Sequence, residues 1–535
     1  LTRSASKFPQ NIAIRFQGYS IAYGKLEELS NRFASALTSL GVGKDTKVAL
    51  LLPNCPQFAI SFYGALKAGA VVVPSNPTYK ERELEHQLSN SESKVLVAAS
   101  NIDGNELFDI VKNVKSKTKL RHVITTSLTD FLPPFKRQFA TLKGVKKIRY
   151  PNTLDFKTLL GKAKSKAPSI SVRAKDDIAV LQYTGGTTGM AKGAMLSHFN
   201  LTCNAIMISK WLPIIETDVN LAVLPFSHIY GLTVALNAPL VVGASIIMLP
   251  KFNADSVLKT CTKERVSVFC GVPTMYSAIL NNPNVGKYDL KSIRRCISGA
   301  APLPLPIMQQ FNQLTGGKLV EGYGLTETSP VTHCNPLDVE GMIKPGSIGI
   351  PFPDTDARVV DLETGTRERE PGEVGELAIK GPQVMKGYWN NPEETIRIFR
   401  ESWLLTGDIT KMDSDGYFFI VDRKKDMINV SGLKVWPREV EDTLSEHPGV
   451  LEAGVIGVPD HYRGEVVKAF VVLKTDHVGK VSVQDLIEFC KSKLAEYKAP
   501  RIIEFKTELP RTLIGKVLRR SLRETEGKAI TSPSR

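Results

Sequence analysis

The sequence has little that would support a disulfide-bonded or zinc-stabilised fold. Its 535 residues include only seven cysteines, which form no CxxC pair and no close Cys/His cluster. An odd, scattered set in a large chain predicts reduced thiols, with neither a disulfide framework nor a zinc site. The chain also lacks an initiator Met and a charged-then-apolar opening segment, so no secretory signal is predicted.

A long uninterrupted hydrophobic run is missing as well. Residues 219–250 carry no charge and are numerous enough to cross a bilayer. However, Pro225, Pro239 and Gly243 interrupt them, and their apolar runs are short and β-branched. We therefore predict the buried wall of a pocket here and no membrane-spanning helix.

The composition is that of a folded protein with more than one domain. With 42% hydrophobic and 23% charged residues, the chain can bury a sizeable core and is not disordered. Single cores stop growing beyond about 250–300 residues, so this length predicts at least two domains.

The positive charge is concentrated in one segment. The chain has a net charge of +15, and residues 111–166 contain fifteen Lys and Arg but only two acids, Asp130 and Asp155. The remainder is close to neutral, which argues against nucleic acid as a partner and favours contact with a local anionic surface.

Hydrophobic periodicity predicts an α/β protein. Leu and Phe recur at three- and four-residue steps over 23–37, which is typical of a helix, and the apolar runs at 47–52 and 70–74 are typical of strands. Strand-then-helix units repeat through about residue 268, which predicts parallel sheet. Further along, the pattern predicts a β subdomain at 346–420, a helix at 438–446, strands at 453–458 and 466–473, and a helix at 483–494.

The strongest local motif is Tyr183-Thr-Gly-Gly-Thr-Thr-Gly-Met-Ala-Lys-Gly193, which follows an apolar run. Its glycines allow backbone N–H groups to close around phosphate oxygens, and its hydroxyls and lysine add donors and charge. The spacing is not that of a Walker loop. Standing alone, the motif would also fit a flexible turn.

Four further motifs carry groups suited to a nucleotide. Glu321-Gly-Tyr-Gly-Leu-Thr-Glu327 offers an aromatic face, a hydroxyl and a carboxylate able to hold a hard cation. Thr406-Gly-Asp408 offers a carboxylate for a ribose diol. Asp422-Arg-Lys-Lys-Asp426 lies where the pattern changes, and Leu509-Pro-Arg-Thr-Leu-Ile-Gly-Lys516 places a lysine on a glycine turn. Each motif taken singly also fits an ordinary turn or a solvated side chain.

Together and in this order, the motifs resemble those of the adenylate-forming superfamily of acyl-CoA synthetases, insect luciferases and peptide-synthetase adenylation domains, over residues 8–522. The resemblance implies an α/β fold with a large N-terminal domain, residues 1–422, of parallel-sheet subdomains plus a β subdomain. A small mobile α+β domain, residues 423–535, would follow. It also implies a two-step reaction, in which a carboxylate attacks the α-phosphate of MgATP to give acyl-AMP and a thiol then displaces AMP. Positioning and charge stabilisation would carry the first step.

The resemblance also implies roles for matching residues. Lys516, Glu327, Thr326 and His228 would be catalytic, with Lys516 bridging carboxylate and α-phosphate and Thr326 contacting the α-phosphate. Glu327 and Thr184 would hold Mg²⁺, Tyr323 would stack on adenine, and Asp408 and Arg423 would bind ribose. The full ATP- and AMP-binding set is Thr184, Gly185, Gly186, Thr187, Thr188, Gly189, Lys192, Gly299, Ala300, Ala301, Glu321, Gly322, Tyr323, Gly324, Thr326, Asp408, Arg423 and Lys516.

Further positions concern the other two substrates. Lys425 would be the hinge about which the small domain turns, and Ser431 and Gly432 would contact the pantetheine arm of CoA. A lone histidine among apolar residues is usually a core residue, but the motif around His228 favours an acyl pocket. The predicted pocket set is His228, Tyr230, Val272, Met275, Gly299 and Val331.

Two departures from the family pattern remove no reacting group. Ala191 replaces the usual proline before the loop lysine, and Ile514 stands where a small polar residue is common. Asn429 occupies the position of the second lysine of luciferases, which counts against light chemistry.

The predicted activity is an ATP-dependent ligase joining CoA to a medium- or long-chain fatty acid. The alternatives are an aryl-CoA ligase of the 4-coumarate type and a free-standing adenylation enzyme that loads a carrier protein. The basic segment interleaves Phe131, Leu132, Phe135 and Phe139 with cations, as membrane-surface elements do, although a solvated loop is the other interpretation. We therefore expect a cytoplasmic protein with peripheral contact to the inner face of the membrane. The oligomeric state is left open between monomer and homodimer.

Overall fold

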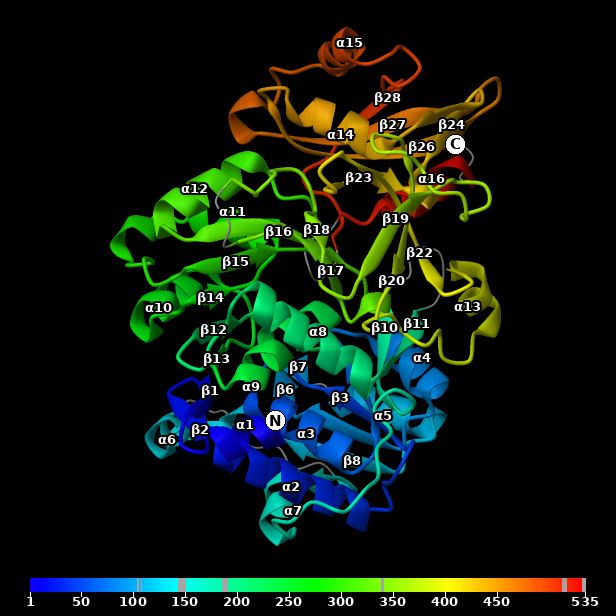
Figure 1. The fold of residues 1–535 in the computed structure, drawn as a ribbon. Helices are drawn as coiled ribbons and strands as arrows, with labels where there is room; N and C mark the ends of the chain where they lie inside the picture. The colour runs from blue at the N-terminus through cyan, green and yellow to red at the C-terminus, as the bar shows by residue number, and fades with distance from the viewer. Residues whose placement is uncertain are drawn as a thin grey trace. The chain divides into compact units, whose positions relative to one another are not determined.

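The computed structural model describes residues 1–102, 105–106, 108–142, 151–184, 191–337, 341–511 and 517–531. The chain forms two compact units. Unit 1 contains Leu1–Thr355 and Lys380–Arg397, and unit 2 contains Asp356–Ile379 and Ile398–Arg535. Both combine helices with sheets, so the predicted α/β class is confirmed (Figure 1).

Unit 1 contains a seven-stranded sheet among its described residues, with the order β11-β10-β4-β3-β5-β8-β9. Its inner strands pair in parallel, whereas β10 and β11 form an antiparallel hairpin at one edge. The strands are β3 (Lys47–Leu51), β4 (Val71–Ser75), β5 (Val95–Ala99), β8 (His122–Thr126), β9 (Leu154–Asp155), β10 (Ile178–Thr184) and β11 (Lys192–Ser197). The strands predicted at 47–52 and 70–74 are confirmed.

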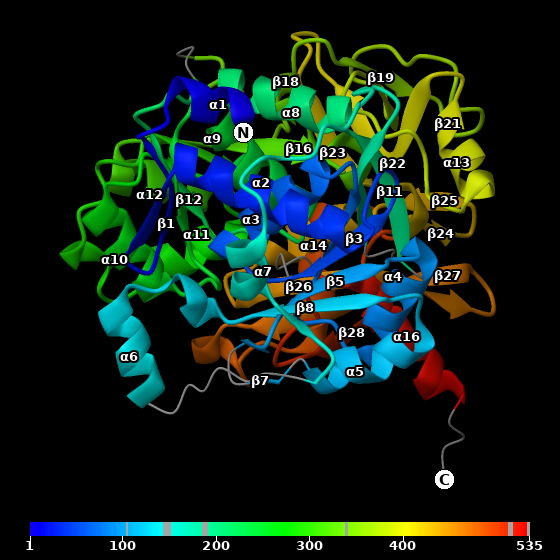
Figure 2. The same cartoon turned by 90° about the horizontal axis from the view of Figure 1, so that it is seen from below.

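Helices cover both faces of this sheet, as continuous hydrophobic strands require. Alternate strand residues such as Ala49 and Leu51 pack with Leu84 of α4 (Glu81–Ser91) and Val111 of α5 (Phe108–Lys117). Helices α2 (Tyr23–Ser39) and α3 (Pro56–Lys67) lie side by side, and α3 packs on β3 and β4 (Figure 2). The helix predicted at 23–37 is therefore confirmed and is slightly longer than expected.

The second sheet of unit 1 has nine strands in the described part of the chain, in the order β18-β17-β16-β15-β14-β12-β13-β1-β2. Its central strands are parallel and its two edges antiparallel. The strands are β1 (Ile12–Phe16), β2 (Tyr19–Ala22), β12 (Val219–Ala222), β13 (Ser245–Met248), β14 (Val268–Phe269), β15 (Arg295–Ser298), β16 (Lys318–Gly324), β17 (Val331–Cys334) and β18 (Ile350–Pro351). The remaining helices of unit 1 are α1 (Thr2–Lys7), α6 (Pro134–Leu142), α7 (Phe156–Lys162), α8 (His198–Trp211), α9 (Ala238–Val242), α10 (Ala254–Glu264), α11 (Pro273–Leu280), α12 (Leu305–Thr315) and α13 (Pro392–Ile398).

Unit 2 contains two smaller sheets. The first is built from β19 (Asp356–Val360), β20 (Gly375–Lys380), β21 (Phe399–Arg400), β22 (Trp403–Met412) and β23 (Phe418–Arg423). These strands fall largely within the region predicted as a β subdomain, although β18 of that region joins the nine-stranded sheet. The division of the chain at 422/423 stays a prediction.

The second sheet of unit 2 is also covered on both faces. Helices α14 (Pro437–Ser445) and α15 (Val483–Lys493) pack on one face, and Leu522 of α16 (Arg519–Thr531) packs on the other. The strands are β24 (Ile428–Val430), β25 (Leu433–Val435), β26 (Val450–Asp460), β27 (Gly464–Leu473) and β28 (Ile502–Phe505). The helices and strands predicted after residue 425 are confirmed.

The charge-free stretch 219–250 is divided between β12, a π-helix at Gly231–Asn237, α9 and β13, and most of it is buried. No helix among the described residues is long and apolar enough to cross a membrane.

All seven cysteines lie in described parts of the chain and are free. Cys55, Cys261, Cys270, Cys296, Cys334 and Cys490 are buried, and Cys203 is half-buried. Burial raises the pKa of the thiols of Cys55, Cys261 and Cys270 to about 12.

Candidate active site

The stem of the predicted phosphate loop is the β10–β11 hairpin. Thr184 and Lys192 are paired residues at its open end, and Tyr183 faces Gly193 one step further in. A Cβ atom at Gly193 would lie 3.2 Å from the Tyr183 ring, so a small residue suits that close approach. The loop residues themselves, Gly185, Gly186, Thr187, Thr188 and Gly189, lie outside the described residues.

Lys192 points toward two side chains that the sequence analysis did not identify. Its Nζ atom lies 2.5 Å from Glu394 Oε1 and 5.4 Å from the centroid of the Tyr388 ring. The side chain of Lys192 is 24% exposed and that of Glu394 is 22% exposed, so the ion pair is partly shielded from water.

The predicted adenine-binding residues follow two neighbouring parallel strands. Gly299 and Ala300 come directly after β15, while Gly322, Tyr323 and Gly324 end β16, which pairs with β15. The carboxyl ends of adjacent parallel strands are where ligands bind in α/β sheets. Ala301 belongs to the same turn after β15.

Local contacts fix these residues. Glu321 is buried and its Oε2 atom accepts a hydrogen bond from the Leu303 backbone N–H at 3.3 Å. The Tyr323 ring packs edge-on against His333 with centroids 5.9 Å apart. A Cβ atom at Gly324 would lie 2.0 Å from the Pro330 carbonyl oxygen, so only glycine fits at that position.

The proposed metal carboxylate lies beside the hairpin. Thr326 and Glu327 are on the 3₁₀ turn Thr326–Thr328, which packs against β10 and β11. The Tyr388 hydroxyl donates a hydrogen bond to Glu327 Oε1 at 2.5 Å, and the Met385 N–H donates to the Glu327 carbonyl at 2.8 Å. A half-buried carboxylate next to the phosphate-loop stem suits a hard cation.

Three of the predicted acyl-pocket positions adjoin one another. The Tyr230 hydroxyl lies 3.0 Å from the Ile297 carbonyl, and its ring lies 3.0–3.2 Å from where a Cβ atom on Gly299 would be. Gly271, which precedes Val272, bridges to Ser298 next to Gly299. Tyr230, Val272, Met275 and Val331 are buried.

His228 is a half-buried neutral imidazole. Its Nδ1 atom accepts a hydrogen bond from the Tyr230 N–H at 3.2 Å, which leaves the proton on Nε2. Burial lowers the pKa of His228 to about 4. The residue is thus suited to lining an apolar pocket and is uncharged near neutral pH.

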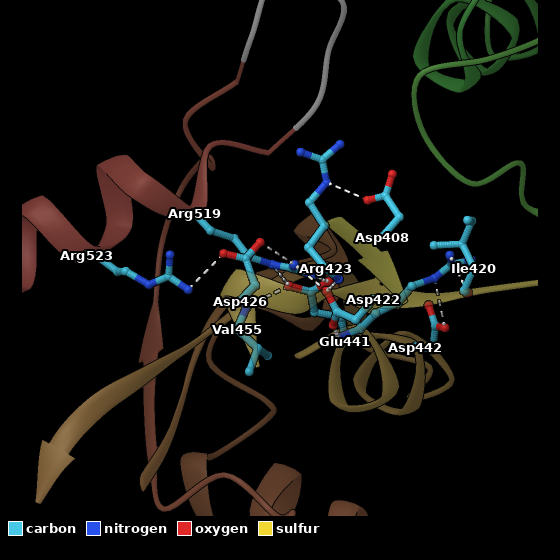
Figure 3. Close-up of polar contacts among 11 residues, drawn as sticks. Asp408, Ile420, Asp422, Arg423, Asp426, Glu441, Asp442, Val455, Arg519 and Arg523 are labelled. Carbon is cyan, nitrogen blue, oxygen red and sulfur yellow. Dashed lines mark hydrogen bonds and ion pairs between the residues drawn. The ribbon is translucent and has the colours of Figure 1, made fainter. Parts of the chain in front are cut away.

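In unit 2 the structure brings the predicted ribose pair together. Asp408 on β22 and Arg423 on β23 are paired residues, and Arg423 Nε lies 3.0 Å from Asp408 Oδ1 (Figure 3). Asp408 is buried, and its N–H donates to the Thr406 hydroxyl at 3.1 Å. The pair presents a carboxylate and a guanidinium side by side on neighbouring strands.

A cluster of ion pairs surrounds the segment that contains the predicted hinge. Arg519 Nη1 contacts Asp422 Oδ1 at 3.0 Å and Asp426 Oδ2 at 3.2 Å, and its other nitrogens bind Glu441 at 3.0 and 2.6 Å (Figure 3). Arg523 adds a 2.9 Å contact to Asp426 Oδ1. Helix α16 is thereby tied to the segment 422–426 and to α14.

Two of the remaining predicted positions of unit 2, Ser431 and Gly432, are exposed. Lys425 belongs to a 3₁₀ turn at Lys424–Asp426, and desolvation together with nearby Arg423 lowers its pKa to about 8. Ser431 and Gly432 form the tip of the β24–β25 hairpin with φ values of 52° and 86°. Lys516 lies outside the described residues.

Comparison with known proteins gives matches over nearly the whole chain. The family model described as "AMP-binding enzyme" matches residues 1–389, and "AMP-binding enzyme C-terminal domain" matches 439–516. A long-chain-fatty-acid–CoA ligase from Bacillus subtilis is 44% identical over 98% of this chain and 94% of that protein. One from Escherichia coli O6:H1 is 38% identical with the same coverage.

A solved structure shares the arrangement of the elements. The crystal structure of ATP-bound MatB from Rhodopseudomonas palustris has a TM-score of 0.86 and 32% identity, covering 98% of this chain and 99% of that one. Its fold and the coverage of the relatives span nearly the whole chain, and the two family models match 1–389 and 439–516. The chain therefore belongs to the AMP-binding enzyme family.

Proposed function

We propose that the protein is an ATP-dependent acid–thiol ligase that joins a fatty acid to CoA through an acyl-AMP intermediate. The main support is that relatives from two different bacteria, similar over nearly the whole chain, are both named long-chain-fatty-acid–CoA ligase. A medium- or long-chain acid is the expected substrate. The aryl-CoA ligase and carrier-loading alternatives are less well supported, because neither is the name of these relatives.

Within this proposal the chain's own residues position the reactants and stabilise charge. Thr184 and Lys192 would hold the phosphates from the two sides of the hairpin opening, and Tyr323 would offer a face to the adenine. Asp408 and Arg423 would bind the ribose hydroxyls, since a carboxylate accepts from them and a guanidinium donates to them. Such positioning converts the attack of the carboxylate into an effectively intramolecular step.

Lys516 would complete the first step. Its ammonium would bridge the fatty acid carboxylate and the α-phosphate, where negative charges meet in the transition state. In the second step Ser431 and Gly432 would contact the pantetheine arm of CoA, after the small domain has turned about Lys425. Thr326 would contact the α-phosphate in both steps.

A magnesium ion is proposed as the metal partner of Glu327 and Thr184. The residues fit the ion, because Glu327 supplies a carboxylate oxygen and Thr184 a hydroxyl beside it on packed elements. Bound there, the ion would neutralise phosphate charge and so favour attack by the carboxylate.

We also propose peripheral contact with anionic membrane through the basic segment 111–166. The exposed side chain of Phe135, on α6 next to Lys136 and Arg137, supports this contact. Phe131 and Leu132 are buried and would not insert. The side chain of Phe139 lies outside the described residues. A cytoplasmic location at the inner face of the membrane, and a monomeric or homodimeric state, stay predictions.

One assay tests the activity. Pyrophosphate release is measured with acetate, octanoate, palmitate and coumarate, each with and without CoA. We expect the fastest release with octanoate or palmitate, and full turnover only with CoA. Preference for coumarate would support the aryl-CoA alternative, and CoA-independent multiple turnover would contradict the ligase assignment.

A further inference from the structure

Residues 385–397, termed here the strap, run along the edge of the phosphate-loop hairpin. The Met195 N–H donates to the Gly387 carbonyl at 2.9 Å, the Lys386 N–H to the Met195 carbonyl at 3.0 Å and the Trp389 N–H to the Gly193 carbonyl at 2.8 Å. Together with the Met385–Glu327 main-chain bond, these contacts extend from β11 to the turn that carries Glu327. The strap is thus attached to both parts of the proposed ATP site.

Two side chains of the strap reach the two charged groups of that site. Tyr388, which is 8% exposed, donates to Glu327 Oε1 at 2.5 Å. Glu394 binds Lys192 at 2.5 Å, and Lys192 also lies 5.4 Å from the Tyr388 ring. One short piece of chain therefore holds the proposed metal carboxylate and the proposed phosphate lysine together.

The strap is also braced internally, so these side chains are presented from a fixed backbone. The Tyr388 N–H donates to Thr395 Oγ1 at 2.9 Å, and the Thr395 hydroxyl donates to the Asn391 carbonyl at 2.9 Å. The Glu394 N–H donates to Asn391 Oδ1 at 3.1 Å, which fixes the first turn of α13.

We propose that Glu394 and Tyr388 act on ATP binding through Lys192 and Glu327, with Glu394 as a competitor of the phosphates and Tyr388 as a positioning residue. Glu394 pairs with Lys192 until the phosphates bind this lysine, while Tyr388 orients Glu327 toward its cation. The inference rests on the proposed function, because it takes Lys192 as a phosphate ligand. Both carboxylate and phosphate would bind the same ammonium, so each weakens the binding of the other.

The exchange leaves Glu394 with a second cation. Arg397 Nη1 lies 3.5 Å from Glu394 Oε2, whereas Lys192 contacts Oε1. Glu394 therefore keeps one paired cation when Lys192 moves to the phosphates. The exchange leaves no unpaired carboxylate, so it costs the protein little free energy.

Calorimetric titration of the full-length protein with MgATP, without fatty acid, tests the role of Glu394. Glu394→Gln keeps the shape but removes the charge that competes for Lys192, so we expect MgATP to bind about 2- to 5-fold tighter, the scale of a partly exposed ion pair. The matched control is Glu393→Gln, which removes the same charge from the exposed neighbouring residue and should leave the affinity unchanged. In a Lys192→Ala background the effect of Glu394→Gln should vanish.

The outcomes distinguish the role of Glu394 from the proposed function. A wild-type protein that fails to bind MgATP contradicts the proposed function itself. If the wild type binds MgATP but Glu394→Gln matches Glu393→Gln, or weakens binding, only the role of Glu394 is overturned. Damage to the fold would weaken binding, so a gain in affinity is not explained by a structural defect.

Tyr388→Phe tests the second residue through the Mg²⁺ dependence of ATP binding. Loss of the hydroxyl should raise the Mg²⁺ concentration needed for half-maximal ATP affinity by about 3- to 10-fold, the scale of one ordinary hydrogen bond. Affinity for ATP at saturating Mg²⁺ should stay within about twofold of the wild type, because the ring is retained. An unchanged Mg²⁺ dependence would overturn the orienting role.

Discussion

The hydrogen bond from Tyr388 occupies one carboxylate oxygen of Glu327, and the second oxygen is the proposed cation ligand. Glu327→Gln keeps the side-chain volume but removes the charge, so we expect weaker Mg²⁺ binding. Loss of electrostatic stabilisation should slow adenylation by about 100-fold or more. Pyrophosphate release measured across a Mg²⁺ titration tests this expectation. Curves that overlay those of the wild type would show that Glu327 is not the ligand.

The depressed pKa of His228 makes a prediction about pH. Because its folded-state pKa is about 4 and an unfolded imidazole titrates near 6.5, the unfolded chain binds more protons between these values. The free energy of unfolding is therefore not reduced by His228 above about pH 6.5. It falls as the pH drops from about 6.5 toward 4, because the unfolded imidazole takes up a proton first. His228→Asn should flatten the dependence of the melting temperature on pH in that window.

The exposed His461 offers the matched comparison for this measurement. His461→Asn should leave the shape of the stability curve unchanged. A wild-type curve that is already flat between pH 4 and 6.5 would contradict the neutral state assigned to His228.

Lys516 is expected to act in only one of the two half-reactions. Lys516→Ala should nearly abolish acyl-AMP formation from ATP and fatty acid, because its charge is needed where carboxylate and phosphate meet. Formation of acyl-CoA from supplied acyl-AMP should be largely retained. Rapid-quench measurement of each half-reaction tests this expectation. Equal losses of rate in both half-reactions would refute the role of Lys516 in adenylation alone.

At the scale of elements, the Arg519 cluster ties α16 to the segment 422–426. Arg519→Met would leave Asp422, Asp426 and Glu441 without their shared cation, and such a loss typically costs about 3–5 kcal/mol. Hydrogen exchange measured under increasing denaturant should show this loss of stability as faster exchange in α16 and β23. Arg520→Met is the matched control, because Arg520 pairs with Glu524 in an exposed i,i+4 contact worth at most about 0.5 kcal/mol. Equal effects of the two substitutions would mean that the cluster adds no stability.

The same cluster should respond to acid. Burial opposes ionisation of Asp426, but Arg519 and Arg523 more than compensate and lower its pKa. Its stabilising effect is therefore present above the unfolded pKa, near 3.9, and is lost as the pH falls through the lower folded value. Asp426→Asn should lower the melting temperature at pH 7 and reduce its further decline below pH 4. A decline as steep as that of the wild type would place the acid sensitivity elsewhere.

Local patterns in the sequence were sufficient for the elements and for part of the site. Periodicity predicted helix α2, strands β3 and β4 and, in unit 2, helices α14 and α15 and strands β26 and β27, because each depends on neighbours within a few residues. The resemblance to the adenylate-forming superfamily also implied that Asp408 and Arg423 would bind one ligand, and the β22–β23 register places them in contact. Residues Gly185–Gly189 and Lys516 fall outside the described chain, so their roles stay predictions.

Three residues near these groups were not found from the sequence. Tyr388 lies 61 residues from Glu327, Glu394 lies 202 residues from Lys192, and Arg519 lies 97 residues from Asp422. Contacts across such separations depend on tertiary packing and leave no periodic trace in a single sequence. The tripeptide Gly387-Tyr-Trp389, in which two large aromatic residues follow a glycine, is the sequence feature that marks the strap.

At the scale of the whole molecule, the uneven charge makes a prediction about membranes. Each Lys or Arg near an anionic surface contributes about 1 kcal/mol, and the effect is screened by salt. Reversal of Arg137, Lys146 and Lys147 to Glu should abolish pelleting with anionic liposomes at low salt and slow the turnover of liposome-borne palmitate. Turnover of dissolved octanoate should persist. Lys136 is left intact because it donates to the Gln17 carbonyl at 2.8 Å.

A control reversal uses Lys259, Lys263 and Arg265, three exposed cations of unit 1 outside the basic segment. It changes the net charge equally and should leave liposome binding intact. Wild-type protein that ignores anionic liposomes at low ionic strength would refute the membrane contact. If the Arg137, Lys146 and Lys147 variant loses octanoate turnover as much as palmitate turnover, the segment is needed for the fold and not for membrane contact.

The burial of the cysteines has a practical consequence for following the motions of this enzyme. Because six thiols are buried and the seventh is half-buried, the native cysteines should react slowly with alkylating reagents. A thiol introduced by Tyr462→Cys, at a side chain that is 91% exposed on unit 2, would react first with a maleimide dye. Paired with a second introduced thiol on unit 1, it would let fluorescence transfer test the proposed turn of the small domain about Lys425 during a single turnover, with every native cysteine kept.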